Sequence, residues 1–396
     1  MKYSLSDACT MVPGFAFKSK DFTANGFPVI KITHINPPSV TMDNLSHVDV
    51  SKYNSDRLEK FLVKKGDFVF AMTGATIGKI GKVNSGSAYI NQRVLTFKAK
   101  EEIIDKNYLY YALSTSSFHD YVISHVDSES AQPNISATTL GKYEIDLPDL
   151  ETQKKIVRIL SALDQKIELN NNEGNTLQSI IDMQYRKVFS ENENNNKTKA
   201  SDLFDYEGGY SYTSAELADE SDIGMMTIKN FERTGGFKVD GFKALSPKKG
   251  TIETAALYDI FISCTDVTQN ADIIGNAVML LDTDKYSTVT YSMDLVRIIP
   301  KINRFALYAI LNSKDFKSFA LGYKSGTTVL HLNKKCLTEY EIALPDERSL
   351  DFFGATVERA CKKIAINLAE NRTLRQMRDT LLPKLMSGEI NLNEIK

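Results

Sequence analysis

One stretch of the sequence decides the fold: residues 147–190 read LPDLETQKKIVRILSALDQKIELNNNEGNTLQSIIDMQYRKVFS. Apolar side chains recur along it in alternating steps of four and three residues, which is the heptad spacing of a helix that pairs with another helix. The apolar members of this seam are Ile156, Leu160, Leu163, Ile167, Leu177, Ile181 and Val188. Roughly 38 residues at about 1.5 Å per residue predict a helix about 57 Å long.

Three residues that are not apolar also occupy seam positions, namely Asn170, Gly174 and Gln184. An amide in such a seam weakens the helix pair but can fix its register. Gly at this position costs roughly 1 kcal/mol relative to Ala. We therefore expect a helix pair with one defined register.

The partner helix is predicted in the same chain, because the tripeptide LPD at 147–149 returns at 344–346, 197 positions later. One offset held over a whole helix indicates two tandem halves, each a globular block followed by a long helix. The alternative is two amphipathic helices in an ordinary α/β protein. The offset carries Ile167 to Ile364, Asn170 to Asn367, Leu177 to Leu374 and Val188 to Leu385.

These patterns predict an α+β chain with two tandem α/β blocks in a pseudo-two-fold arrangement, separated by an antiparallel coiled coil of the two helices. The expected boundaries are a first block at 1–146, a first helix at 147–190, a polar linker at 191–200, a second block at 201–343, a second helix at 344–390 and a tail at 391–396. Near the end of the second helix, Pro383 is expected to kink or end it.

Composition is that of a soluble globular protein, with 42% hydrophobic and 25% charged residues in 396. This length favours two or more domains. We find no membrane span or signal-peptide core, so we expect a cytoplasmic protein. Four scattered cysteines predict reduced thiols, and five scattered histidines predict no structural metal.

Charge is distributed unevenly between the two blocks. Residues 14–100 contain 13 Lys and Arg against 6 Asp and Glu, an excess of seven positive charges. Residues 200–347 contain 15 against 21, an excess of six negative charges. The first block is therefore suited to binding phosphates, whereas the second could bind them only if its basic residues gather on one face.

The first block predicts strands at 29–35, 67–72 and 94–98 and a helix at 107–114. Two loops stand out, TGATIGKIGK at 73–82 and SAQPNIS at 130–136. The second block repeats this order with altered loops. Equivalent segments are 14–17 with 209–212, 30–32 with 226–228, 67–70 with 259–262, 73–76 with 265–268, 111–113 with 308–310, and 130–140 with 325–337.

Sequence motifs for catalysis are weak. The segment 36–39 (NPPS) is similar to an amino-methyltransferase motif but lacks its aromatic residue, and no glycine-rich cofactor loop precedes it. The segment 74–79 lacks the spacing and the Ser or Thr of a phosphate-binding loop. We predict a chain that is not an enzyme and binds no cofactor.

The chain resembles the DNA-specificity subunits of type I restriction–modification enzymes over nearly its whole length. The resemblance rests on the two halves, the LPD openings with long helices, the loops TGATIGKIGKV and SAQPNIS, the segment ETQKKIVRILSALDQKIELNNN and the ending LLPKLMSGEI. It implies two target-recognition domains that each read one half of a split site in double-stranded DNA, with the helices as a ruler. It also implies two modification subunits and restriction motor subunits as partners, and a subunit that catalyses nothing.

Side chains of Thr, Asn, Gln, Lys and Arg on loops can contact phosphates and base edges. We assign Lys79 and Lys82 to phosphates and Gln132 to an adenine edge. The alternative for each candidate is an ordinary solvated loop residue, and His331 is also compatible with packing. The predicted DNA contacts are Lys31, Thr73, Thr76, Lys79, Lys82, Arg93, Gln132 and Asn134 in the first block, and Lys229, Arg233, Thr265, Thr268, Gln269, Asn270, Lys324, Thr327, Thr328 and His331 in the second.

Two other functional classes stay open. A repeat-built scaffold could use its coiled coil to join protein partners without binding DNA, and the acidic second block favours this reading. A solitary methyltransferase is the other alternative, against which the missing motifs count. Binding of random duplex across a salt series separates the first alternative from a DNA-binding subunit.

Overall fold

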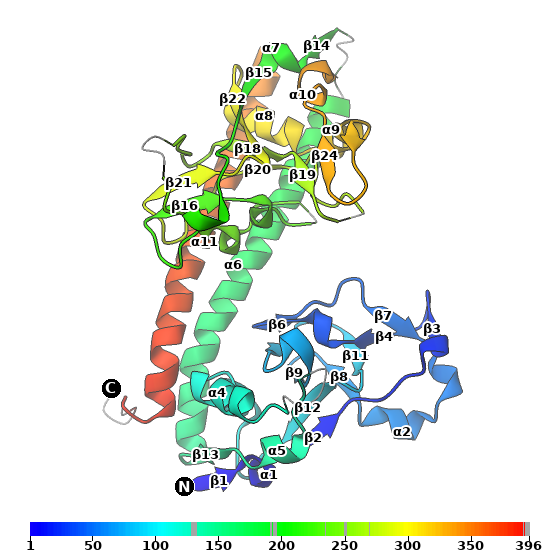
Figure 1. Cartoon of the computed structure of the whole chain (residues 1–396), viewed down its shortest axis with the longest axis vertical. Coiled ribbons are helices and arrows are strands. Elements are labelled where there is room, and N and C mark those ends of the chain that lie inside the picture. Colours follow the sequence, from blue (N-terminus) through cyan, green and yellow to red (C-terminus); the bar gives the residue numbers. More distant parts are fainter. Residues whose placement is uncertain are drawn as a thin grey trace. The chain divides into compact units, whose positions relative to one another are not determined.

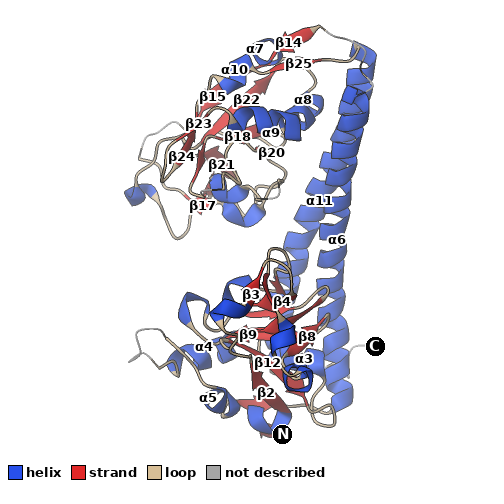
Figure 2. Cartoon of the chain, turned by 90° about the vertical axis from the view of Figure 1, so that its right-hand side faces the viewer, coloured by secondary structure: helices blue, strands red, loops and turns tan. Residues whose placement is uncertain are grey.

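The structure, a computed structural model, describes residues 1–127, 133–190, 192, 196–233, 235–248, 252–268, 270–390 and 392. Two compact units are present (Figure 1): unit 1 comprises Met1–Leu163 with Met377–Lys396, and unit 2 comprises Asp164–Gln376. Each unit therefore joins one block to segments of both long helices. The predicted mixture of helix and sheet is confirmed in both blocks (Figure 2).

The two long helices are α6 (Leu150–Ser190) and α11 (Glu347–Met386). The repeated LPD tripeptide has a structural reason, because its aspartate caps each helix. Asp149 Oδ1 accepts from the backbone N–H of Thr152 at 2.9 Å, and Asp346 Oδ1 accepts from that of Ser349 at 3.0 Å. Pro383 does not end α11 but lies in its last turn, three residues before Met386.

In unit 2 the two helices run antiparallel. Asn170 in the middle of α6 bonds to Asn371, whereas Phe189 at the end of α6 packs on Phe353 near the start of α11, with ring centroids 5.9 Å apart. Asn371 occupies the position at which α6 has Gly174, and it is fully buried. A seam of apolar residues thus surrounds a polar centre.

That centre consists of two equivalent sets of three residues, related by the 197-residue offset. The amide of each asparagine donates to the glutamate of the opposite helix, at 2.9 and 2.8 Å. Each lysine lies 3.1 or 3.2 Å from the same glutamates. Buried amides that find partners in only one alignment fix the register. The sets are Lys166, Asn170 and Glu173 in α6, and Lys363, Asn367 and Glu370 in α11.

The first block is built on two sheets. The strand order in one is β2 (Cys9–Pro13), β12 (Val94–Ala99), β9 (Phe68–Ala71), β10 (Ile80–Lys82), β6 (Ser39–Val40) and β5 (Ile35–Asn36). The order in the other is β3 (Phe22–Thr23), β7 (Ser46–Val48), β4 (Phe27–Ile30), β11 (Ser87–Ile90) and β8 (Leu62–Lys64). Its main helices are α1 (Leu5–Ala8), α2 (Ser55–Glu59), α3 (Lys106–Ala112), α4 (Ser116–Ser124) and α5 (Ala137–Gly141).

The sequence of strand β9 is FVFA, an uninterrupted apolar run, because this strand is buried on both faces. Phe68 and Phe70 belong to a core shared with the helices, whereas Val69 and Ala71 belong to the core between the sheets. Successive residues of a strand point to opposite faces, so a doubly covered strand shows no polar alternation. In unit 1 the first of these cores also contains Leu385 of α11.

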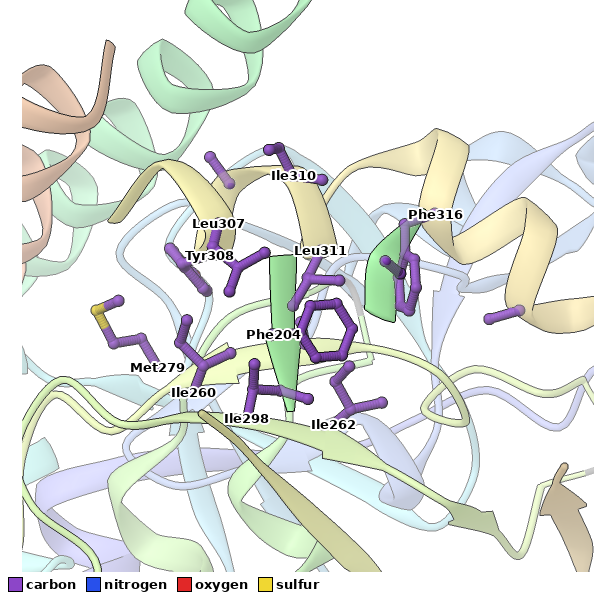
Figure 3. Packing of buried hydrophobic residues seen from close by; sticks show 14 of the residues in the cluster. Phe204, Ile260, Ile262, Met279, Ile298, Leu307, Tyr308, Ile310, Leu311 and Phe316 are labelled. Atoms are coloured by element: carbon purple, nitrogen blue, oxygen red, sulfur yellow. The ribbon is translucent and has the colours of Figure 1, made fainter. Parts of the chain in front are cut away.

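The second block repeats this plan. The strand orders are β15 (Phe204–Gly208), β22 (Leu295–Pro300), β18 (Ile260–Ser263), β20 (Ala277–Met279) in one sheet and β17 (Lys243–Ala244), β16 (Ile223–Met226), β21 (Thr288–Tyr291) in another. Helix α8 (Arg304–Leu311) lies over the first sheet, and its Leu307, Tyr308 and Leu311 point towards Ile260 and Ile298 (Figure 3). The remaining short helices are α7 (Ala200–Leu203), α9 (Lys314–Leu321) and α10 (Cys336–Glu339).

A glycine at the same place in each block shows how closely the two frames agree. A Cβ on Gly14 would lie 2.2 Å from the backbone oxygen of Asn91, and one on Gly209 would lie 2.2 Å from that of Ser292. Only glycine permits this approach, which explains why the sequence repeats a glycine before an aromatic residue here.

The chain enters and leaves each block at adjacent strands. In the first block β1 (Lys2–Ser4) pairs antiparallel with β13 (Glu144–Asp146), directly before α6. In the second, β14 (Lys197–Lys199) pairs antiparallel with β25 (Glu341–Ala343), directly before α11.

One strand prediction is wrong in part. The segment 29–35 was expected as one strand, but β4 ends at Ile30, and a 3₁₀ turn, η2 (Ile32–His34), follows. The reason is local, because the backbone N–H of Lys31 donates to Nδ1 of His34 at 2.9 Å and turns the chain. All four cysteines are buried and unpaired, as expected. Within the described residues, no helix is both long and apolar enough to cross a membrane.

Replacing Asn170 by Ala should lower the free energy of unfolding by about 1–3 kcal/mol, because buried Asn371 and half-buried Glu370 lose a hydrogen-bond donor. Urea denaturation measures this difference. Asn172→Ala is the matched control, since this side chain lies two residues away and is exposed. An equal loss in both variants would show that the polar centre contributes nothing specific.

Candidate nucleic-acid interface

In the first block the two predicted loops lie together. Thr73 forms a β-bridge with Asn134, and the backbone N–H of Gly74 donates to the carbonyl of Pro133 at 3.0 Å. The backbone N–H of Ile135 donates in turn to Met72 at 3.1 Å. The loops at 73–79 and 133–136 therefore form one surface. Gln132, predicted to read a base, lies outside the described residues.

Glycines give the first loop its shape. Gly74 and Gly78 have φ angles of 72° and 84°, a region that residues with a side chain rarely adopt. Gly78 also lies against α4, where an added Cβ would be 3.3 Å from Cδ2 of His119. The loop is thus seated on the helix beneath it.

Exposed positive charge on this surface comes from Lys79 and Arg93. The surface also has an exposed acid, Asp127, whose backbone N–H donates to the carbonyl of Asn134 at 2.9 Å. Lys82, which like Lys79 was assigned to phosphates, is half-buried, and its Nζ lies 4.1 Å from the ring centroid of Tyr110 and 5.0 Å from that of Tyr111. Lys31 likewise lies 4.4 Å from the ring centroid of Phe22. These two ammonium groups pack on aromatic faces of the block itself.

Thr73 was predicted to contact DNA, but it is only 1% exposed and so does not lie on the surface. Its Oγ1 is buried without a hydrogen-bond partner, as is Oδ1 of half-buried Asn134 in the adjoining loop. The hydroxyl of Thr76 donates to the carbonyl of Thr73 at 3.3 Å. The threonines here shape the loop more than they extend from it.

The second block assembles the equivalent surface from a small sheet of β19 (Thr265–Asp266), β24 (Leu330–Leu332) and β23 (Lys324–Ser325). Thr265 is paired with His331, as Thr73 is with Asn134. Several predicted residues meet here, and the exposed ones are Asn270, Lys324, Thr327, Thr328 and His331. Gln269 lies outside the described residues.

Two threonines of this surface use their hydroxyl groups internally. Thr265 Oγ1 donates to Oδ1 of Asp294 at 3.0 Å, and Thr268 Oγ1 donates to Oδ1 of Asp266 at 2.8 Å. Lys229 and Arg233 are exposed but belong elsewhere, on the turn that follows β16. That turn includes η6 (Ile228–Asn230) and η7 (Val239–Gly241).

Asp294 was missed by sequence reasoning, although the repeat could have revealed it. Its carbonyl accepts from the backbone N–H of Cys264 at 2.7 Å, as the carbonyl of Arg93 accepts from that of Met72 at 3.0 Å. The two residues therefore hold equivalent positions with opposite charges. The first block has a base beside its bridge, whereas the second has an acid that holds Thr265.

The acidic excess of the second block is partly internal. Glu216, Asp266 and Asp282 are buried. Glu216 accepts from the hydroxyl of Tyr210 at 2.5 Å and from the backbone N–H groups of Thr213 and Lys248. These bonds, with the hydroxyl of Tyr210 first among them, lower the pKa of Glu216 to about 2. The total charge of this block thus overstates the negative charge on its surface.

Asp259 also lies in a basic setting, 3.4 Å from Arg297 and 3.6 Å from Arg304. Among the described residues, no group of three His, Cys, Asp or Glu side chains could hold a metal ion. The arrangement is suited to contacts made by hydrogen bonds, lysines and arginines on loops.

Comparison with known proteins gives consistent results. A family model described as "Type I restriction modification DNA specificity domain" matches residues 1–179 and again 192–350. The specificity subunit of the type I restriction enzyme HindI of Haemophilus influenzae is 24% identical, over 98% of this chain and 99% of its own length. That of MjaVIII of Methanocaldococcus jannaschii is 30% identical, over 43% of this chain and 40% of its length.

Among solved structures, the type I restriction–modification S subunit from M. genitalium superposes with a TM-score of 0.55 at 16% identity, covering 97% of this chain and 95% of its own. At this identity the similarity concerns the fold.

Replacing Glu216 by Gln should destabilise the chain in a pH-dependent way. The pKa of the folded state lies below the ordinary value, so the ionised carboxylate contributes stability that is complete above about pH 4.5 and is lost as the pH falls towards about 2. Denaturant unfolding should therefore show a deficit at pH 7 that shrinks below pH 4.5. Glu220→Gln, an exposed neighbour, is the control. A deficit that is independent of pH would contradict the role of the charge.

Proposed function

The chain belongs to the family of type I restriction–modification DNA-specificity domains, and we propose that it is the subunit that selects the DNA sequence for such an enzyme. Its two blocks act as target-recognition domains, each reading one half of a split site in double-stranded DNA. The observation that carries this proposal is the repeated bridge, Thr73 with Asn134 and Thr265 with His331, around which the exposed side chains differ.

Two surfaces on one frame suit the reading of two different sequences. In the first block the exposed basic groups beside the bridge are Lys79 and Arg93, next to exposed Asp127; arginine pairs well with guanine and lysine with phosphates. In the second they are Lys324 and His331 with small polar loop residues. Burial of several acids removes part of the objection raised by the charge of the second block.

We assign no catalytic step and no cofactor to this chain. The NPPS segment is explained structurally, because the carbonyl of Pro38 accepts from the backbone N–H of Lys82 at 2.9 Å and from the hydroxyl of Tyr110 at 3.3 Å. Its partners in this proposal are two modification subunits, which methylate, and restriction motor subunits, which cut. It acts in the cytoplasm, where these subunits meet DNA.

The helices set the distance between the half-sites in this proposal. Helices of 41 and 40 residues are about 60 Å long, which corresponds to roughly 18 base pairs at about 3.4 Å each and leaves roughly 5–8 unread pairs between two short half-sites. The fixed register of the polar centre supports this role, because a shift of one helix along the other would change the distance between the half-sites.

Lys79→Ala should weaken binding to all duplexes alike and lower the slope of log affinity against log salt by about one, because one phosphate contact is lost. Lys82→Ala should leave that slope unchanged, since its ammonium packs on Tyr110 and Tyr111. Titration of cognate and scrambled duplex across a salt series, in the complex with modification subunits, measures both. A change of preferred base in Lys79→Ala would contradict its assignment, and a wild-type complex that binds neither duplex at any salt concentration would favour a scaffold that does not bind DNA.

Insertion of one heptad into each helix, at matching positions, should widen the unread spacer and leave both half-sites unchanged. Each heptad adds about 10 Å of helix, or roughly three base pairs. The methylation pattern of host DNA with the altered chain shows the new spacer. A continuous recognised sequence, or an unaltered spacer in a folded variant, would refute the ruler.

A further inference from the structure

The loop that follows β19 in the second block is held from two sides by two charged side chains, Asp266 and Lys317. It runs from Asp266, the last residue of β19, to Gly275, and Gln269 within it lies outside the described residues. In the first block the equivalent segment takes its shape from Gly74 and Gly78. The second block has Asp266 in place of Gly74, so other interactions must shape its loop.

Asp266 holds the loop through its backbone N–H groups. Its side chain is fully buried, and Oδ1 accepts from the N–H of Thr268 at 2.7 Å. Oδ2 accepts from the N–H of Ile273 at 2.6 Å and from that of Ile274 at 3.1 Å. One carboxylate therefore draws both ends of the loop together. Burial raises the pKa of Asp266, but these bonds outweigh it and the net pKa is lowered.

Lys317 holds the same loop through its carbonyl groups. It lies on α9, half-buried, and its Nζ donates to the backbone oxygens of Ala271, Asp272 and Ile274 at 3.2, 3.4 and 2.5 Å. All three donors of the ammonium group are engaged, so this lysine is not available to a phosphate. Ala271 has a φ of 56°, a conformation that the surrounding bonds must maintain.

The first block has a counterpart at the same helical position. Phe118 and Phe316 follow equivalent caps, Thr115 of α4 and Ser313 of α9, so that His119 corresponds to Lys317. His119 lies beside Gly78, where an added Cβ would be 3.3 Å from Cδ2 of the histidine, whereas Lys317 bonds to three carbonyls. In both blocks the loop therefore packs on the equivalent helix, but the side chain that contacts the loop differs.

We propose that Asp266 and Lys317 are positioning residues for recognition of the second half-site: together they fix the loop after β19 in its reading shape, and neither contacts DNA. This inference rests on the proposed function. The loop presents Val267, 64% exposed, and exposed Asn270 outwards, while the two charged groups stay inside.

The protonation state of Lys317 provides a test that separates the shape of the loop from the stability of the chain. Burial lowers the pKa of Lys317 to about 8, opposed by Asp266 and Asp272 and assisted by Lys324. Raising the pH from 7 to 9 removes its proton in the folded chain, and a neutral amine has only two donors for three carbonyls. Across this window the contribution of Lys317 to the free energy of unfolding rises with pH, because the unfolded lysine keeps a proton that the folded one has lost. Loss of this proton therefore does not itself unfold the chain, and denaturant unfolding at pH 7 and pH 9 separates a change of loop shape from a loss of stability.

The experiment compares cognate duplex with duplexes scrambled in the first or the second half-site, using the full chain in complex with modification subunits. Asp266→Asn and Lys317→Met should reduce discrimination at the second half-site by roughly ten- to a hundredfold and leave the first unchanged. The wild type should lose second-site discrimination between pH 7 and 9. Lys314→Met, an exposed lysine on the same helix, is the matched control and should behave as wild type.

The outcomes are distinct. Full second-site discrimination in both variants, or its loss equally at both half-sites, overturns the positioning role while the proposed function stands. Discrimination by the wild type that does not change with pH overturns the part assigned to the Lys317 ammonium. A wild-type complex that distinguishes neither half-site overturns the proposed function and this inference with it.

Discussion

Buried amides in the middle of a helix pair constrain the structure most strongly. In unit 2, Asn170, Asn367 and Asn371 are at most 2% exposed, and their donors reach partners across the pair. A shift of one heptad would place these groups against apolar side chains, at a cost of several kcal/mol for unpaired buried polar groups. The pair thus has one register. The second block is tied to the same helix, because the guanidinium of Arg372 donates to Asp282 and to the carbonyl of Asp284.

The two blocks show how one frame can carry different chemistry. Strands β9 and β18 each alternate between two cores of their own block, and each block has a bridge at the same place. At the equivalent position beside that bridge, Arg93 in one block faces solvent, whereas Asp294 in the other binds a threonine. Net charge therefore describes neither surface, since it counts buried acids such as Glu216 together with exposed groups.

Much of the frame could be predicted from the sequence, because periodicity and offset are global signals. The heptad seam predicted α6 and α11 to within a few residues, and the strands predicted at 67–72 and 94–98 correspond to β9 and β12. The contacts were harder to predict. Thr73 and Thr265 look alike in the sequence, yet one hydroxyl has no partner and the other binds Asp294, which is 29 residues away. Lys317 was overlooked because its carbonyl partners are recognisable only once the loop is folded.

Adjacent entry and exit strands make each block a self-contained insert. The pairs β1 with β13 and β14 with β25 close the chain on itself just before a long helix begins. A genetic exchange with breakpoints at these strands would replace a whole block without altering the seam or its asparagines. The geometry that makes the chain stable thus also makes it modular, so that a new sequence preference could be acquired by recombination in one step, while the helix pair stays the same.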